Sequence, residues 1–257
     1  MSRVQLWSSG GGTQSTAIAV LILQGRLPKP DLAVIADTGR EKASTWAYLQ
    51  DYVEPALAAI GVHIHRIKKN NYGAPDIVAF NGKDVLMPMW TRQNGDLGKM
   101  KTMCSTEWKQ RPVRRFASGE YPAAQFRVWM GMSYDEPKRI KPTLEEKWLN
   151  WYPLFDMRLT RSDCIDLVQA YGWPIPPQSS CWMCPNRRAQ QWKAMSIENP
   201  QEFLKAVALE DEIREGHDDQ MFFHEYGVPL AQAVLMTPPE QPKLFDTERC
   251  DSGQCFL

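Results

Sequence analysis

Short apolar runs alternate with longer, largely apolar stretches from the N-terminus to residue 68. Three runs are typical of buried strands, namely VQLW (4–7), DLAVIAD (31–37) and VHIHRIK (62–68). The stretches between them, 16–25 and 42–61, are long enough for helices; Gly25 ends the first, and Pro55 marks a kink or break in the second. Alternation of strand and helix predicts a parallel sheet with helices on both faces.

The pattern becomes less regular beyond this point. Residues 69–126 are rich in Gly, Pro, Asn and Lys, and three later elements are predicted, a strand at 125–133 and helices at 159–173 and 200–216. Thr160 is a predicted N-cap, with Asp163 three residues later as an imperfect capping box. The predicted fold is α/β, with a Rossmann-like doubly wound parallel sheet over residues 1–155 and a helical, cysteine-bearing C-terminal region over 156–257.

Composition places the chain among ordinary globular proteins. Of its 257 residues 43% are hydrophobic and 23% charged, and 30 basic residues balance 30 acidic ones, so any affinity for nucleic acid has to be local. No apolar stretch approaches the roughly 18–20 residues that span a bilayer, and the N-terminus lacks the pattern of a signal peptide. We therefore expect a cytoplasmic protein without a membrane segment, whose six cysteines are metal ligands or reactive thiols.

The segment LWSSGGGTQST (6–16) places three glycines between the first strand and the first helix. A turn at this position can bind phosphate, because backbone N–H groups and the positive end of the helix point at the anion. No lysine follows the glycines, which excludes a P-loop, and Ser15 excludes the G-x-G-x-x-G fingerprint. A strand-to-helix turn without a ligand remains the alternative.

The loop GGGTQS (10–15) resembles S-G-G-x-D-S, the pyrophosphate loop of the PP-loop superfamily of ATP pyrophosphatases and sulfonucleotide reductases. The matching residues are Gly11, Gly12 and Ser15. Gly10 stands where serine is usual, Ser9 lies one place upstream, and Gln14 replaces the aspartate. An amide is a poorer ligand for a hard cation than a carboxylate, so this change argues against Mg²⁺ binding at Gln14.

Further segments resemble motifs of the same superfamily in the same order. They are ADTGREKAST (36–45), similar to D-T-G-x-E; CSTEWKQRPV (104–113), similar to C-C-x-x-R-K-x-x-P; MGMSYDEPKR (130–139), similar to G-x-x-x-D-E-x-x-R; YPLFDMRLTRSDCIDLV (152–168), similar to a proline–leucine–aspartate segment; and SSCWMCP (179–185), similar to G-C-x-x-C. Ser105 and Trp108 depart from the second motif, where cysteine and arginine are usual. Over residues 8–185 the chain resembles the PAPS reductase-like family.

The resemblance implies an adenine nucleotide, either PAPS, APS or ATP, as the ligand. The implied nucleotide-binding residues are Ser9, Gly10, Gly11, Gly12, Gln14, Ser15, Asp37, Thr38, Glu41 and Gly131. Lys109 and Arg139 are implied to neutralise oxyanions during catalysis, and the guanidinium fork of arginine suits planar oxyanions.

Two cysteines form a CxxC within a proline-flanked, turn-like segment, Cys181 and Cys184, a spacing at which both sulfurs can converge on one metal. The resemblance nominates Cys104 as a further ligand, and Cys250 of the tail is the expected fourth. An iron–sulfur cluster is expected, with structural Zn²⁺ as the alternative; reduced thiols or a thioredoxin-like pair are also open. Cys164, within a predicted helix, is expected to be a small core residue.

The tail ends in RCDSGQCFL. PAPS reductases carry a catalytic cysteine on a mobile C-terminal segment, where its thiolate attacks the sulfur of the bound sulfonucleotide. The candidate nucleophile here is whichever of Cys250 and Cys255 does not bind metal, and Cys255 is the one expected. Sulfite would then leave with the help of a thioredoxin-like reductant. Both tail cysteines could instead be ligands or simple tail thiols. The alternative functions are an ATP pyrophosphatase that adenylates an acceptor, and a non-catalytic nucleotide- or nucleic-acid-binding module.

Residues 99–115 form a local basic stretch in a neutral chain. Its cations are Lys99, Lys101, Lys109, Arg111, Arg114 and Arg115, against Glu107 alone. It could bind the anionic part of a nucleotide or a nucleic-acid backbone, or it could be a solvated helix face. His63 and His65 alternate on a predicted strand and are expected to be ordinary strand residues.

Overall fold

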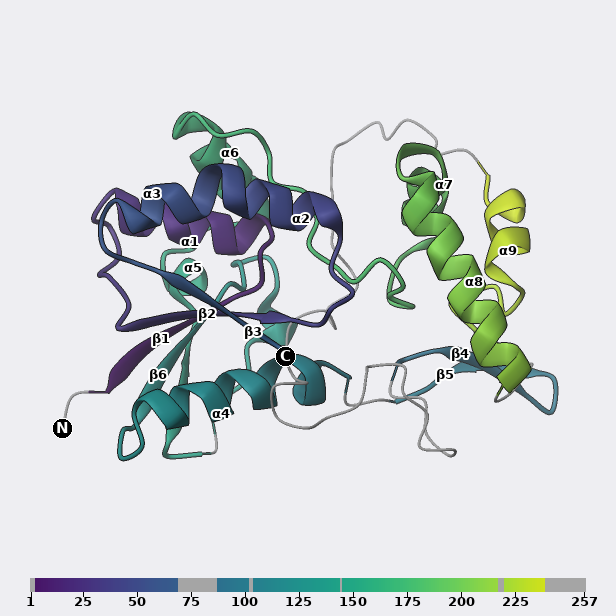
Figure 1. The fold of residues 1–257 in the computed structure, drawn as a ribbon, viewed down its shortest axis with the longest axis horizontal. Helices are drawn as coiled ribbons and strands as arrows, with labels where there is room; N and C mark the ends of the chain where they lie inside the picture. Colours follow the sequence, from purple (N-terminus) through teal and green to yellow (C-terminus); the bar gives the residue numbers. More distant parts are fainter. Residues whose placement is uncertain (1–2, 69–86, 102–103, 144, 217–219, 239–257) are drawn as a thin grey trace. The chain divides into compact units, whose positions relative to one another are not determined.

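The computed structural model describes residues 3–68, 87–101, 104–143, 145–216 and 220–238 (Figure 1). The chain divides into two compact units. Unit 1 comprises Met1–Ala74 and Glu107–Ser179, and unit 2 comprises Pro75–Thr106 and Ser180–Leu257. The division expected at residue 155 therefore differs from this grouping, because residues 156–179 belong to unit 1 and 75–106 to unit 2.

The described strands of unit 1 form a five-stranded parallel sheet of order β3-β2-β1-β6-β7. These strands are β1 (Val4–Ser9), β2 (Leu32–Asp37), β3 (Ile64–Lys68), β6 (Phe126–Met130) and β7 (Trp148–Trp151). Leu6 of β1 is in register with Leu32 on one side and Val128 on the other. The chain proceeds outward from β1 to β3 and then continues on the opposite side of β1, so the strand order reverses between β1 and β6.

Helices cover both faces of this sheet, as Figure 1 shows. Up to Ala170 the chain forms α1 (Thr13–Leu23), α2 (Ala43–Tyr48), π-helical η1 (Leu49–Val53), α3 (Glu54–Ala58), π-helical η3 (Thr106–Gln110), α4 (Arg111–Glu120), 3₁₀-helical η4 (Pro137–Arg139), α5 (Pro153–Asp156) and α6 (Arg161–Ala170). Trp7, Ile18 and Cys164 belong to the buried core under α1 and α6, whereas Leu6 and Val113 belong to the core under α4. The predicted Rossmann-like, doubly wound α/β fold is confirmed.

Two local features of unit 1 follow from sequence chemistry. Thr160 and Asp163 form a full capping box: the Asp163 N–H donates to Thr160 Oγ1 at 3.2 Å, and the Thr160 N–H donates to Asp163 Oδ2 at 2.8 Å. Hydrogen bonds from Thr160 lower the pKa of Asp163.

The predicted helix at 42–61 is interrupted by η1, which directly precedes α3. Pro55 lies in the first turn of α3. Proline has no N–H to donate to the preceding turn, which accounts for the irregularity there.

Unit 2 combines helices with a small antiparallel sheet of order β5-β4-β8. Its elements are β4 (Trp90–Gln93), β5 (Asp96–Lys99), α7 (Ala189–Glu198), α8 (Pro200–Gly216), β8 (Met221–Phe222) and α9 (Leu230–Met236). Helix α8 has the predicted bounds, whereas α7, α9 and the sheet were not predicted. Among the described residues, no helix combines the length and hydropathy that a bilayer crossing requires.

A buried carboxylate holds part of unit 2 together. Glu210 of α8 is fully buried, and its two oxygens accept hydrogen bonds from the backbone N–H groups of Phe223 and Leu230, both at 2.5 Å. Burial raises the pKa of Glu210 to about 7, although the two N–H donors act in the opposite direction. The side chain thereby attaches the segment after β8 to α8.

Candidate functional site

The reversal of strand order places the carboxyl ends of β1 and β6 next to each other, which is where open α/β sheets bind ligands. The glycine loop follows β1, and Gly131 follows β6. A Cβ at Gly131 would lie 3.4 Å from the Gln14 Cβ and from both N and Oγ of Ser15. The chain after β6 thus lies against the first turn of α1, with which a Cβ at position 131 would be in van der Waals contact.

Two of the loop glycines serve different purposes. Gly11 has a φ of +71°, which residues with a side chain rarely adopt, and a Cβ there would lie only 3.0 Å from Thr45 Cγ2. Gly12 is the N-cap of α1, has an ordinary φ of −103°, and leaves the helix without a side-chain cap. The first-turn N–H groups of α1, at the positive end of the helix, have no partner within the helix itself.

Three hydroxyl groups fix the path of this loop. The Gly10 N–H donates to Ser15 Oγ at 2.8 Å, and the Gly11 N–H donates to Ser9 Oγ at 3.3 Å. Ser179 Oγ lies 2.5 Å from the Gly10 carbonyl oxygen, to which it donates. Ser9 and Ser15, predicted to bind nucleotide, therefore shape the loop itself. Ser179, which was not singled out from the sequence, contributes from a distant part of unit 1.

The predicted residues at the end of β2 and just after it are connected to the glycine loop by hydrogen bonds through Ser179. Glu41 Oε1 lies 3.2 Å from both Thr45 Oγ1 and Ser179 Oγ. Asp37 and Thr38 accept hydrogen bonds from the backbone N–H groups two residues further on, at 2.7 Å and 3.2 Å, and so hold the turn after the strand. Unit 1 thus connects Glu41 to the glycine loop through one serine hydroxyl.

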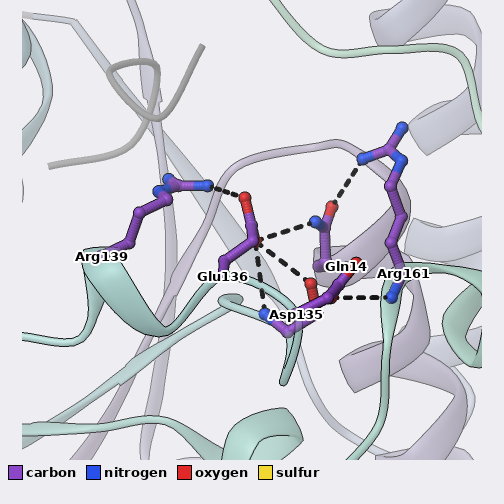
Figure 2. Close-up of polar contacts among 6 residues, drawn as sticks. Gln14, Asp135, Glu136, Arg139 and Arg161 are labelled. Atoms are coloured by element: carbon purple, nitrogen blue, oxygen red, sulfur yellow. Dashed lines mark hydrogen bonds and ion pairs between the residues drawn. The ribbon is translucent and has the colours of Figure 1, made fainter. Parts of the chain in front are cut away.

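Gln14 lies at the centre of a polar network that joins α1, the chain after β6, and α6 (Figure 2). Its amide nitrogen donates to Glu136 Oε2 at 3.2 Å, and its amide oxygen accepts from Arg161 Nη1 at 3.3 Å. Glu136 also accepts from Ser133, through its N–H and its hydroxyl, and forms an ion pair with Arg139 at 2.5 Å. The structure brings the predicted residues Gln14 and Arg139 together, along with Ser133 and Arg161, which were not predicted.

This network gives a physical reason for glutamine at position 14. Its nitrogen lies 3.2 Å from a Glu136 oxygen, so a carboxylate in the same place would put two negative charges in contact. The amide donates to Glu136 on one side and accepts from Arg161 on the other. Both polar ends of Gln14 are thereby used within the protein.

Several cations of the basic stretch have local partners. Arg111 pairs with Glu107 at 2.6 Å, and Arg114 pairs with Glu145 at 2.7 Å. Lys99 lies over the Trp90 ring and donates to the Pro185 carbonyl at 3.3 Å. Lys99 and Lys101 belong to unit 2, and the other four cations, Lys109 included, belong to unit 1. Nucleic-acid binding through residues 99–115 stays a prediction.

The three described cysteines of the predicted metal centre all belong to unit 2. The Cys184 N–H donates to the Cys181 carbonyl at 3.1 Å, so the CxxC forms a tight turn, and Arg187 Nη2 donates to the same carbonyl at 3.1 Å. Among the residues that the structure describes, no three His, Cys, Asp or Glu side chains are grouped to hold a metal ion. The predicted ligand Cys250 and the predicted nucleophile Cys255 lie outside the described residues. The metal centre therefore stays a prediction.

Two other sequence expectations concern Cys164 and two histidines, of which His65 lies in β3 and His63 directly precedes it. Cys164 is fully buried in the core, and burial raises the pKa of its thiol to about 12. This agrees with its predicted role as a core residue. His65 lies against Phe116, with ring centroids 5.3 Å apart, and both His63 and His65 are exposed.

Two solved structures similar to this chain are a reductase and a thiolase. Phosphoadenylyl-sulfate (PAPS) reductase from Candida auris, in a phosphate complex, is 12% identical with a TM-score of 0.46, over 71% of this chain and 83% of the reductase. The U34-tRNA thiolase NcsA from Methanococcus maripaludis, with its 4Fe–4S cluster, is 13% identical with a TM-score of 0.45, over 99% of this chain and 81% of the thiolase.

No family model matches the sequence, and no curated protein matches it. At identities of 12% and 13%, the two structural similarities do not identify a reaction. A functional proposal has to rest on the residues of the site.

Proposed function

We propose that this chain binds an adenine nucleotide at the carboxyl edge of the unit 1 sheet and catalyses thiol-dependent release of sulfite from a sulfonucleotide, PAPS or APS. The observation that carries the binding site is the meeting of the glycine loop and Gly131 where the strand order reverses. There the first turn of α1 has no side-chain cap, and a Cβ added at Gly131 would lie 3.4 Å from Ser15 N. Backbone N–H groups and the helix dipole favour an oxyanion at this place.

The proposed roles follow from position. Residues Ser9–Ser15 cradle the phosphate or sulfate end of the nucleotide, and Asp37, Thr38 and Glu41 line its pocket after β2. Arg139 and Lys109 are proposed to balance negative charge. Because Glu136 and Ser133 hold Arg139 and Gln14 in a shared network, the polar surroundings of the loop are fixed before a ligand arrives.

The proposed chemistry takes two steps. The thiolate of Cys255 attacks the sulfur of the sulfate group, the bond from that sulfur to the bridging phosphate oxygen breaks, and the nucleotide leaves with its electron pair. A thiolate of a thioredoxin-like partner then attacks Cys255 Sγ, so that sulfite leaves and a disulfide joins the two sulfurs. The two thiols supply the two electrons that reduce sulfate to sulfite.

A turnover assay tests this reaction. The full chain is incubated with PAPS, and separately with APS, in the presence of reduced thioredoxin, and sulfite is measured. We expect wild-type protein to release sulfite and Cys255→Ser to release none while still binding nucleotide. Sulfite release by Cys255→Ser at the wild-type rate contradicts the assigned nucleophile.

The alternative adenylating reaction is measured on the same preparation. The protein is incubated with ATP and Mg²⁺, and pyrophosphate is measured. We expect none, because Gln14 lacks the carboxylate that the PP-loop motif carries at this position. Pyrophosphate release without sulfite release would favour the ATP pyrophosphatase over the reductase.

A further inference from the structure

We infer that Arg161 is an anion-contacting residue of this site and contributes more to the affinity for the ligand's oxyanion than Arg139 does. The inference deepens the proposed function and rests on it. Arg161 is the first residue of α6, and its Nη1 atom lies 3.3 Å from the amide oxygen of Gln14, the second residue of α1 (Figure 2). Its guanidinium therefore lies beside the first turn of α1, where the oxyanion is proposed to bind.

The position of Arg161 is well fixed. The capping box of Thr160 and Asp163 determines where α6 begins, and the Arg161 N–H donates to Asp135 Oδ1 at 3.1 Å. Helix α6 shares the buried core with α1 through Cys164 and Val168. The capping box, the hydrogen bond to Asp135 and the packing of α6 against α1 therefore fix the backbone from which the Arg161 side chain extends to Gln14.

The two arginines of the network differ in what their charges already face. Arg139 forms a 2.5 Å ion pair with Glu136, and both side chains are nearly buried. The Arg161 guanidinium, by contrast, contacts the neutral amide of Gln14, and within the described part of the chain it forms no ion pair. A charge that faces a neutral dipole keeps most of its attraction for an incoming anion, whereas a charge paired with a carboxylate does not.

The carboxylates near Arg161 accept hydrogen bonds from groups other than its guanidinium. Glu136 accepts from Arg139, Ser133 and Gln14. Asp135 accepts from the backbone N–H of Arg161 rather than from its guanidinium, and Asp163 accepts from Thr160. Because Gln14 is uncharged, it forms no ion pair with the Arg161 guanidinium, whereas an aspartate or glutamate at position 14 could do so.

Helix stability does not account for an arginine at this position. A cation in the first turn of a helix faces the positive end of the helix dipole, which is mildly unfavourable. An anion bound between the first turns of α1 and α6 would reverse this effect, because it would interact favourably with both helix ends and with the guanidinium. The substrate class that fits is an adenine nucleotide whose phosphate or sulfate group reaches Gln14.

The test measures binding of PAPS, adenosine 3′,5′-bisphosphate and adenosine by calorimetry to five proteins. These are the wild type, Arg161→Gln, Arg161→Lys, Arg139→Gln and the control Arg26→Gln. Arg26 is an exposed arginine of the same unit that contacts Gln24. Circular dichroism verifies that each variant is folded, and Arg161→Lys, which keeps the charge, serves where the glutamine variant does not fold.

We expect Arg161→Gln to weaken PAPS binding about tenfold or more and to leave adenosine binding unchanged, since only the anionic part of the ligand faces the guanidinium. Arg161→Lys should retain part of the affinity, and Arg26→Gln all of it. The PAPS affinity of Arg161→Gln should also depend less on salt concentration than that of the wild type.

Four results would overturn the inference. Wild-type PAPS affinity in Arg161→Gln overturns the role of Arg161 alone, and so does an equal loss of adenosine and PAPS binding, which indicates a merely structural role. A greater loss for Arg139→Gln than for Arg161→Gln, with both variants folded, reverses the ranking of the two arginines. Failure of the wild type to bind any of the three probes overturns the proposed function and, with it, the inference.

Discussion

Replacing Glu210 by glutamine should remove a pH dependence of stability from unit 2. The carboxyl group is fully buried, and burial raises its pKa from 4.5 to about 7. A carboxyl whose pKa is raised by folding binds more protons in the folded state than in the unfolded state. Its stabilising contribution is therefore complete below about pH 4.5 and is lost as the pH rises through about 7.

The magnitude follows from the same two values. A rise in pKa from 4.5 to about 7 corresponds to a fall in the free energy of unfolding of about 3 kcal/mol across this interval. Glutamine has the same shape as a protonated glutamic acid but does not titrate. It presents a single oxygen acceptor to the N–H groups of Phe223 and Leu230, so one of these donors is left without a full partner, which costs about 1–3 kcal/mol.

Urea denaturation between about pH 5 and pH 8 at constant ionic strength measures the effect, with tryptophan fluorescence as the signal. Trp192 is fully buried and stacks on Phe223, so it reports on this part of unit 2. We expect Glu210→Gln to be less stable than the wild type at pH 5, and this difference should shrink by about 2–3 kcal/mol toward pH 8. Glu212→Gln, at an exposed position of the same helix, is the control and should show no such change.

A constant difference between wild type and Glu210→Gln over this pH range would refute the reasoning. A difference that grows with pH would also refute it. That result would mean that the two backbone donors stabilise the carboxylate by more than burial destabilises it, and that the pKa of Glu210 is lowered rather than raised.

The remaining predictions concern the glycine loop and the buried thiol. Gly11→Ala should lower the free energy of unfolding by about 2–4 kcal/mol, because it combines a left-handed φ with a Cβ only 3.0 Å from Thr45 Cγ2; denaturation with urea measures this. Gly12→Ala should lower it by less than Gly11→Ala does, because its φ is ordinary and the new Cβ would approach Ser179 Cβ only to 3.3 Å, and yet weaken PAPS binding, so a variant that binds PAPS normally would contradict the proposed site. Iodoacetamide should alkylate Cys104 and Cys184 of the native protein before Cys164, whose thiol is buried with a pKa of about 12; mass spectrometry of the peptides decides this, and early labelling of Cys164 would contradict it.

Much of unit 1 could be predicted because its signals are local. The short apolar runs become β1, β2 and β3, and the alternation of strand and helix is itself the signature of a parallel sheet. The capping box at Thr160 needs only residues that are close in sequence. The sheet of unit 2 was not predicted, since β5 reads DLGK and its residues are largely exposed, so no apolar alternation marks it.

The site was predictable as a set of residues but not as an arrangement. The resemblance of the motifs nominated Gln14 and Arg139 separately, and nothing in either motif indicates that Glu136 lies between them. Gln14 and Arg161 are 147 positions apart, and Ser179 and Gly10 are 169 apart. Contacts of this kind depend on the tertiary packing of α6 and of the chain around Ser179 against the first turn of α1, which local patterns do not encode.

The division of the chain into interleaved segments has a consequence for its synthesis. A ribosome completes the first part of unit 1 at Ala74 and the first part of unit 2 at Thr106, before β6 and β7 exist. Strands β1, β2 and β3 must therefore wait, with one sheet edge still open, until residues 126–151 emerge, and β4 must wait for β8 at residues 221–222. Neither unit can be obtained by cutting the gene once, and a nascent chain halted near residue 106 would present an incomplete sheet to chaperones.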